Sequence, residues 1–162
     1  GQHMDYTVQK AVELGVRRIV PLFTEFSNVR LEQDRARKRH EHWHKIIISA
    51  CEQSGLNIVP ELVEAVPLRD WVSIDPAMVK LLMHPDAQAG LSTLAVDTAS
   101  ISLLCGPEGG LSQDEVDFSV QQGYQKVSLG PRILRTETAA IAAVAVCQAL
   151  CGDIMYNRSP QD

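Results

Sequence analysis

The chain has 162 residues and a formal net charge of −5 at pH 7. This length predicts one domain with its own core, and a composition of 45% hydrophobic and 22% charged residues excludes a disordered chain. No apolar run approaches membrane-spanning length and no signal peptide opens the chain, so the sequence predicts a soluble, cytoplasmic protein without a membrane partner.

The first half of the chain alternates helical and extended patterns. Apolar residues recur at helical spacing over residues 4–14, and Gly15 follows as a stop signal. Residues 16–23 are typical of a strand, residues 30–54 of a long helix whose second half is apolar, and residues 57–62 of an extended segment. Helix and strand patterns therefore follow each other from the start.

The long predicted helix carries a cluster of cations at its polar beginning: Arg30, Arg35, Arg37, Lys38 and Arg39. An acidic chain is a weak candidate for nucleic-acid binding, because phosphate contacts dominate such affinity. The cluster is either a solvated helix face or a local basic patch, and charge alone favours the solvated face.

Histidine and cysteine positions predict no metal site. His40 and His44 share one face of the long helix, but no third ligand accompanies them. The four cysteines lack the paired spacing of metal ligands and lie among apolar residues. We therefore expect free thiols in a reducing compartment at Cys51, Cys105, Cys147 and Cys151.

The second half of the chain repeats the alternation of strands and helices. Its predicted elements are a helix over 68–73, strands over 78–84, 100–106 and 126–130, and a very apolar helix over 138–152. Ser112 and Glu115 form a capping-box pattern that begins one further helix, between the last two strands. The predicted fold is therefore α/β, with a mainly parallel sheet flanked by helices.

Three predicted strands end in unusual sequences: Met-His-Pro at 83–85, Cys-Gly-Pro-Glu-Gly-Gly at 105–110, and Ser-Leu-Gly-Pro-Arg-Ile-Leu-Arg-Thr-Glu-Thr at 128–138. Ligands of open parallel sheets bind beyond the carboxyl ends of the strands. Glycines let a ligand approach the main chain, and prolines fix the shape of a loop. The two Gly-Pro loops among these ends predict a rigid cradle for a planar, polar ligand, with a generic tight loop as the alternative.

The glycine-rich loop does not have the pattern of a phosphate-binding loop. Gly109 and Gly110 are followed by Leu-Ser-Gln instead of Lys and Ser or Thr, and the chain has no G-x-G-x-x-G motif. Glu108 in the same loop would repel a phosphate but would tolerate a cation. The pattern favours a nucleoside-type ligand with positive or zwitterionic character.

Two stretches of the chain resemble one family. "LLCGPEGGLSQDEV" and "VSLGPRILRTETAAIAAVAVCQAL" are similar to the C-terminal part of the bacterial 16S rRNA (uracil-N3)-methyltransferase family, RsmE, of the SPOUT superfamily. "MDYTVQKAVELGVRRIVPLFTEFSNVR" and "ACEQSGLNIVPEL" resemble the preceding part of the same domain. The chain departs from the family at Leu56, where a basic residue is common, so a contact with RNA or substrate is in doubt there.

The resemblance implies a fold, a cofactor and partners. Residues 1–162 would form a SPOUT methyltransferase domain with a C-terminal trefoil knot, without the small PUA-like RNA-binding domain that precedes it in the family. It would bind S-adenosylmethionine, act as a homodimer, and have 16S rRNA or the small ribosomal subunit as its partner. The implied cofactor-binding residues are Leu82, His84, Gly106, Pro107, Glu108, Gly109, Gly110, Leu129, Gly130, Ile133, Leu134, Thr136 and Thr138.

The implied reaction transfers a methyl group to N3 of a uridine, which must first lose its proton. Arg132 and Arg135 are the expected cations for the negative charge of the uracil or for a phosphate. Glu137 would orient an arginine or accept the proton, or would only satisfy the dipole of the helix that follows. Thr136 is also a predicted helix N-cap. The alternatives are a non-catalytic RNA- or nucleoside-binding module and a methyltransferase for the ribose 2′-OH of tRNA.

Overall fold

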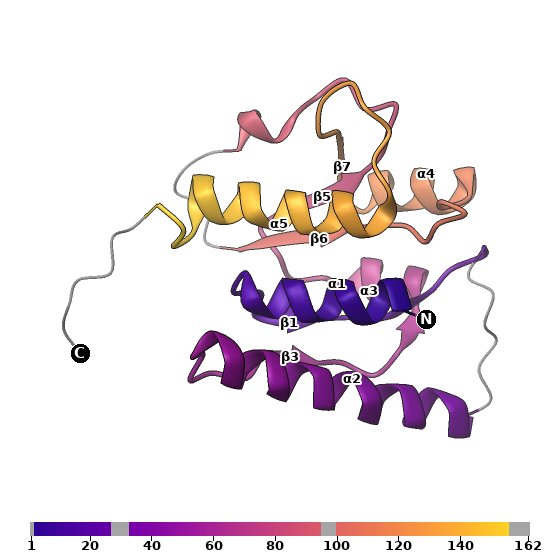
Figure 1. Ribbon diagram of the computed structural model, residues 1–162. Coiled ribbons are helices and arrows are strands. Elements are labelled where there is room, and N and C mark those ends of the chain that lie inside the picture. The colour runs from indigo at the N-terminus through magenta and orange to yellow at the C-terminus, as the bar shows by residue number, and fades with distance from the viewer. Residues whose placement is uncertain (1, 27–32, 95–99, 156–162) are drawn as a thin grey trace.

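Figure 1 shows the computed structural model of the protein, which describes residues 2–26, 33–94 and 100–155. The elements in chain order are α1 (Gln2–Glu13), β1 (Arg18–Ile19), β2 (Leu22–Phe23), α2 (Gln33–Ser54), β3 (Glu61–Leu62), β4 (Val66–Pro67), α3 (Leu68–Ile74), β5 (Val79–Met83), the short 3-10 helix η1 (Leu91–Thr93), β6 (Ile101–Leu104), α4 (Gln113–Gln121), β7 (Gln125–Val127) and α5 (Thr136–Cys151).

The described strands all pair in parallel. β5 lies between β6 and β7 in a three-stranded sheet, and β1 pairs with β3 and β2 with β4 in two shorter ladders. Helices lie on both sides of these strands (Figure 1). The predicted α/β fold, a mainly parallel sheet flanked by helices, is confirmed.

The central strand β5 shows how the sheet acquires two apolar faces. Successive side chains of a strand point to opposite faces. Leu82 packs in a buried cluster with Leu68 of α3 and Val116 of α4, whereas Leu81 packs in another cluster with Ala143 of α5. The sheet is therefore covered by α3 and α4 on one face and by α5 on the other.

The N-terminal half has a core of its own, between α1 and α2. Val8 and Val12 of α1 are buried against Trp43 and Ile47 of α2. These residues recur at helical spacing on both helices, so each helix turns one apolar stripe toward the other. This packing holds α1 between α2 and α5, as Figure 1 shows.

Several element boundaries differ from the sequence prediction. The strand expected over 16–23 is divided into β1 and β2 by Pro21, which has no N–H to donate to a ladder. β4 was not predicted, because two residues carry no periodic pattern. The expected beginning of the long helix at residue 30 lies outside the described residues. α5 begins at Thr136, two residues earlier than expected.

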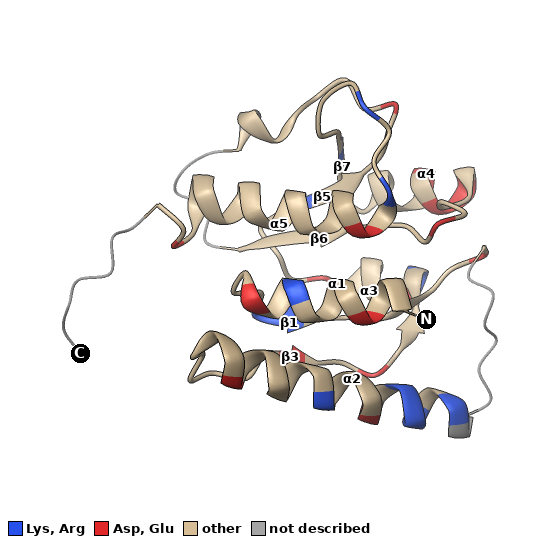
Figure 2. Ribbon diagram, viewed as in Figure 1, with Lys and Arg blue, Asp and Glu red and all other residues tan. Residues whose placement is uncertain are grey.

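No helix in the described ranges combines the length and the apolar character that a membrane crossing requires. Figure 2 shows the cluster's cations that lie within the described residues, from Arg35 to Arg39, in blue at the N-terminal end of α2. This end of α2 and the N-terminal end of α5 lie at the same end of the molecule (Figure 1).

Candidate functional site

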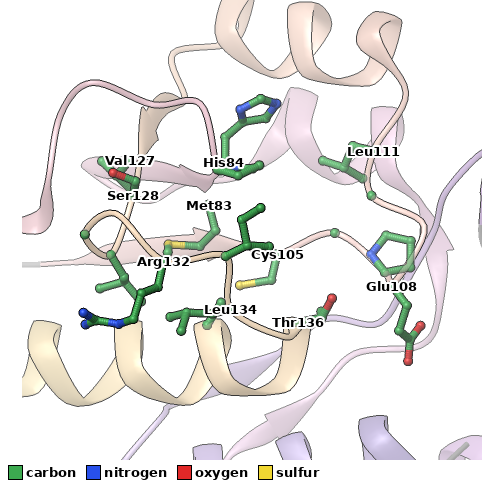
Figure 3. Close-up of a pocket in the computed structure, with 18 residues that line it drawn as sticks. Met83, His84, Cys105, Glu108, Leu111, Val127, Ser128, Arg132, Leu134 and Thr136 are labelled. Atoms are coloured by element: carbon green, nitrogen blue, oxygen red, sulfur yellow. The ribbon is translucent and has the colours of Figure 1, made fainter.

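A cavity of about 280 Å³ lies where the three strands of the larger sheet end. Its walls come from the segments that follow β5, β6 and β7, and the first turn of α5 closes one side (Figure 3). Parallel strands present their carboxyl ends at one edge, so three loops distant in the sequence meet there. The volume is near the lower end of the range for small-molecule sites, about 300 Å³.

The segment after β5 forms the first wall. Met83, His84 and Pro85 line the cavity, and the backbone N–H of His84 donates to the carbonyl of Val127 over 2.9 Å. The ring of His84 makes a local hydrogen bond, in which its Nδ1 accepts the backbone N–H of Asp86 over 3.3 Å. His84 therefore shapes the turn at the strand end.

The segment after β6 forms the second wall and needs its glycines. A Cβ at Gly106 would lie 3.2 Å from Cγ of Leu111 and 3.3 Å from the carbonyl carbon of Gly110. Gly110 has a φ of +76°, a conformation that other residues rarely adopt, and its N–H donates to the carbonyl of Pro107 over 2.8 Å. The loop is closed so tightly on itself that side chains are excluded.

The segment after β7 forms the third wall. Ser128 anchors its beginning, because its N–H donates to the carbonyl of Ala89 and its Oγ to that of Ala87, over 2.9 and 3.1 Å. Within the described part of the chain, the N–H groups of Gly130, Ile133 and Leu134 make no hydrogen bond. Such groups are free to meet the acceptor atoms of a ligand.

The cavity brings together most of the residues that the sequence predicted. Eleven of them line it: His84, Gly106, Pro107, Glu108, Gly110, Leu129, Gly130, Arg132, Ile133, Leu134 and Thr136. Figure 3 shows Glu108 and Arg132 at opposite ends, with Leu134 and Thr136 along the side of α5. The ends of the cavity therefore differ in charge.

Leu82 and Gly109 were predicted to bind the cofactor but lie outside the cavity lining. The side chain of Leu82 is fully buried in the core, because strand alternation turns it toward α3 and α4 and leaves Met83 at the cavity. Gly109 faces away: a Cβ on it would lie 3.3 Å from Cβ of Phe26.

Arg135, Glu137 and Thr138 also lie outside the cavity lining. Arg135 stands at the N-cap position of α5 without a capping side-chain bond, so the predicted N-cap role of Thr136 is wrong. Oε1 of Glu137 instead accepts a hydrogen bond from Nδ1 of His3 on α1, over 3.1 Å. Thr138 is exposed, on a different side of the helix from Thr136.

The electrostatic surroundings of Glu137 favour its charged form. Its own backbone N–H donates to the carboxylate, and this bond, with smaller contributions from His3 and Arg135, holds its pKa below the ordinary value of 4.5. Glu137 therefore stays ionised at neutral pH and is a weak proton acceptor. The arrangement fits a carboxylate in the first turn of a helix, one of the two roles left open by the sequence.

Sequence reasoning missed seven residues of the lining: Met83, Pro85, Cys105, Leu111, Val127, Ser128 and Ala139. Six of them belong to, or directly adjoin, the three strand-end sequences from which the cradle was predicted, and Ala139 follows the predicted Thr138. Burial, with a smaller contribution from Cys147, raises the pKa of Cys105 to about 12. Its thiol therefore serves as a neutral, apolar part of the wall.

Two histidines of α2, His40 and His42, have structural partners. Nε2 of His40 donates to the carbonyl of Leu62 over 3.1 Å, and Nε2 of His42 donates to Oδ2 of Asp5 over 2.9 Å. Among the described residues, no group of three His, Cys, Asp or Glu side chains could hold a metal ion. These histidines connect α2 to β3 and α1.

A parallel α/β sheet with glycine-rich loops around a cavity at its carboxyl edge is the arrangement of an α/β ligand-binding domain. Residues 1–148 match the model of the RNA methyltransferase domain family, and the chain belongs to this family. The resemblance noted in the sequence is confirmed.

Curated relatives of the chain include the ribosomal RNA small subunit methyltransferase E proteins of Buchnera aphidicola subsp. Schizaphis graminum (strain Sg) and Bacillus subtilis (strain 168). The Buchnera protein is 38% identical over 154 residues, which are 94% of this chain and 63% of the relative. The Bacillus protein is 30% identical over 154 residues, covering 90% of this chain and 60% of the relative. The chain thus spans a little under two thirds of the length of these relatives.

Two solved structures are also similar. A methyltransferase from Legionella pneumophila, in complex with the bound cofactor SAM, aligns with a TM-score of 0.92 and 42% identity over 95% of this chain and 64% of its own. The ribosomal RNA small subunit methyltransferase E of Neisseria gonorrhoeae, bound to S-adenosyl methionine, aligns with a TM-score of 0.88 and 42% identity over 95% and 63%.

Proposed function

We propose that this chain is the catalytic domain of an S-adenosylmethionine-dependent methyltransferase that modifies N3 of a uridine in small-subunit (16S) ribosomal RNA. One observation carries the proposal: three strand ends enclose a cavity whose walls are glycine-rich backbone with unpaired N–H groups. Membership of the RNA methyltransferase domain family, and the names of similar proteins, support the cofactor and the substrate that we assign to the cavity.

The residues of the cavity fit S-adenosylmethionine. The N–H groups of Gly130, Ile133 and Leu134 suit the acceptor edge of an adenine, and apolar side chains such as Leu129 suit its faces. The carboxylate of Glu108 suits a positively charged group at the other end. When bound, the cofactor supplies an electrophilic methyl group on its sulfonium.

The proposed reaction requires the protein to stabilise negative charge on the uracil. Loss of the N3 proton spreads negative charge onto O2 and O4 of the base, and we assign its stabilisation to the guanidinium of Arg132, which lines the cavity. Arg135, exposed at the beginning of α5, is assigned to a phosphate beside the target base. Glu137 is assigned the orientation of Arg135, whose positive charge helps to lower its pKa, because a carboxylate with a lowered pKa is a poor base.

The ribosomal RNA partner gains support from the charge distribution. Arg35, Arg37 and Lys38 are exposed in the first turns of α2, and Figure 2 shows these cations at one end of the helix. That end of the molecule also holds the N-terminal end of α5, whose first turn closes the cavity (Figure 1). RNA phosphates on α2 would thus lie on the side of the molecule that presents the cavity.

We assign two further features of the family to this chain. The segment from Ser128 into α5 would complete a trefoil knot, because it follows an outer strand, β7, and returns over the central strand β5. A second copy of the chain would cover α5, since that helix is very apolar and only Ala140 and Ala143 are buried among its described residues. Sedimentation of the protein as a dimer tests the second assignment.

Calorimetric titration with S-adenosylmethionine tests the cofactor assignment. Wild-type protein should bind in the micromolar range or tighter, and Gly106→Ala should bind roughly 10-fold or more weakly, because the new Cβ displaces the loop at Leu111. Gly123→Ala is the matched control: it strains a glycine that has a φ of +93° and does not line the cavity, so it should leave binding unchanged.

Nucleoside mass spectrometry of small-subunit RNA treated with the protein and cofactor separates the activities. N3-methyluridine supports the proposal. 2′-O-methylated nucleosides would assign the chain to ribose methylation instead. Cofactor and RNA binding without any methylated product would make the domain a binding module.

A further inference from the structure

Glu115 is a buried carboxylate outside the cavity, and it joins two distant segments of the chain. It stands in the first turn of α4 and is only 7% exposed. Its Oε2 accepts the backbone N–H of Ser112 over 3.0 Å, and its Oε1 accepts the backbone N–H of Glu25 over 2.9 Å. Ser112 directly follows the cavity loop, whereas Glu25 lies 90 residues before Glu115, just after β2.

The residue after Glu25 also touches the cavity loop. Phe26 packs so closely on Gly109 that a Cβ there would lie 3.3 Å from Cβ of Phe26 and 3.9 Å from its carbonyl oxygen. The neighbours of Gly109, which are Glu108 and Gly110, line the cavity. One side of this loop therefore faces the ligand space, and the other side rests on Phe26.

Helix capping explains only half of this arrangement. A capping box needs one oxygen of the carboxylate for the N–H of the N-cap residue, and Ser112 completes it by accepting the N–H of Glu115 over 3.3 Å. The second oxygen of such a glutamate ordinarily faces water. In this chain that oxygen is buried and accepts a bond from the β2 side, which compensates for its loss of hydration.

We propose that Glu115 is a positioning residue for the cofactor loop. Its carboxylate holds the segment Thr24–Phe26 against residues 106–112, and so gives the loop its binding shape before a ligand arrives. A loop ordered in advance loses less conformational entropy on binding, so this contact raises affinity without touching the ligand. The inference rests on the proposed function of the cavity as a site for S-adenosylmethionine.

Glu115→Gln tests the inference because glutamine has only one acceptor oxygen for two N–H donors. Local geometry should preserve the bond to Ser112, which leaves the N–H of Glu25 without its acceptor. We expect the dissociation constant for S-adenosylmethionine to rise roughly 3- to 10-fold, the equivalent of one lost hydrogen bond. The KM for the cofactor should rise in parallel, with kcat at saturation within about twofold of wild type.

Two matched variants separate positioning from general effects. Asp114→Asn removes a negative charge from the same helical turn at an exposed position and should leave affinity unchanged. Ser112→Ala weakens the start of α4 but retains both bonds to the carboxylate of Glu115. A loss of affinity in Ser112→Ala as large as in Glu115→Gln would assign the effect to helix capping and overturn the inference.

Hydrogen exchange supplies a readout that does not depend on the ligand, and the amides of α1 report whether a variant is folded. In wild-type protein the amides of Glu25 and Ser112 both donate to the carboxylate of Glu115, so their hydrogen-exchange protection factors should be similar. In Glu115→Gln the Glu25 amide should exchange at least about 10-fold faster, while amides in α1 stay unchanged.

The outcomes distinguish the two proposals. Wild-type protein that fails to bind S-adenosylmethionine contradicts the proposed function, and exchange at Glu25 and Ser112 then still decides whether Glu115 holds the loop. Wild-type protein that binds, with a Glu115→Gln variant of equal affinity and unchanged Glu25 exchange, overturns the positioning role alone.

Discussion

The two halves of the molecule are stabilised in different ways. In the N-terminal half, α1 and α2 bury Val8, Val12, Trp43 and Ile47 against each other. In the half that carries the cavity, the strands and helices enclose two buried apolar clusters, but the three loops depend on individual hydrogen bonds, such as those of Ser128 and Gly110. Packing forms the scaffold, and a few polar contacts determine the shape of the ligand site.

The halves meet through polar contacts as well as packing. Nε2 of Gln148 on α5 donates to the carbonyl of Leu14 over 2.7 Å, and His3 pairs with Glu137. Glu115 accepts the N–H of Glu25 across the same boundary. Substitutions in the N-terminal half should therefore change global stability, while those at the boundary or in the loops should change ligand binding.

The largest effect is expected from Trp43→Ala. Trp43 is 7% exposed, and its Nε1 donates to Oδ1 of Asp5 over 3.0 Å. Removing a buried tryptophan should lower the free energy of unfolding by about 3–5 kcal/mol. Denaturant titration measures this loss, and calorimetry under native conditions should show unchanged affinity for S-adenosylmethionine in the folded fraction.

Trp71→Ala is the matched control for Trp43→Ala. Trp71 is only partly buried, beside Arg18, and its loss should cost clearly less stability. If folded Trp43→Ala protein loses cofactor affinity, then the shape of the cavity depends on the α1–α2 core. Global stability and ligand binding would then not be controlled by separate halves.

The sequence predicted elements where a periodic pattern runs over many residues. The helices, the parallel strands β5, β6 and β7, and the capping box of Ser112 and Glu115 all carry local signals, and each is present. The sequence did not show that residues 16–23 form two strands, β1 and β2, because Pro21 is compatible with the edge of one strand as well as with a break between two.

The cavity residues were predicted to within about one position, and the errors have physical causes. Adjacent residues of a strand face opposite sides, so Met83 lines the cavity and Leu82 the core. The choice between Gly109 and Gly110 depends on Phe26, which is distant in the sequence. The pairing of Glu137 with His3 is likewise set by tertiary structure.

An intermediate effect is expected from Lys38→Glu. If α2 contacts RNA phosphates, this variant should bind a single-stranded segment of small-subunit RNA roughly 3- to 10-fold more weakly, and the slope of log affinity against log salt should fall by about 0.7. Fluorescence anisotropy over a salt series measures both quantities. Affinity for S-adenosylmethionine should not change, because Lys38 is not among the residues that line the cavity.

Lys45→Glu gives the matched comparison on the same helix. Lys45 is also exposed but lies about two turns further along α2, away from the cluster of cations. Its reversal should weaken RNA binding less than Lys38→Glu does. Equal losses of RNA affinity in the two variants would mean that RNA is attracted diffusely along the helix. No loss in either variant would mean that α2 is a solvated face that does not contact RNA.

The smallest effect is expected at Asp5, which connects α1 to α2. Burial raises the pKa of Asp5, but hydrogen bonds from His42 and Trp43 outweigh it, and the pKa lies below the ordinary value of 3.8. A carboxylate with a lowered pKa in the folded state contributes stability above its unfolded pKa and loses it as the pH falls through the folded value.

Asp5→Asn should therefore lower the free energy of unfolding at pH 7 by less than about 1 kcal/mol, since the carboxylate is partly exposed and screened by water. The difference from wild type should shrink as the pH falls below 3.8, where the native carboxylate takes up its proton. Urea titrations from pH 7 down to about pH 3 measure both values. A difference that stays constant over this range would show that Asp5 acts through the neutral geometry of its bond to Trp43. The polar contact between α1 and α2 would then be independent of charge, like the apolar core around it.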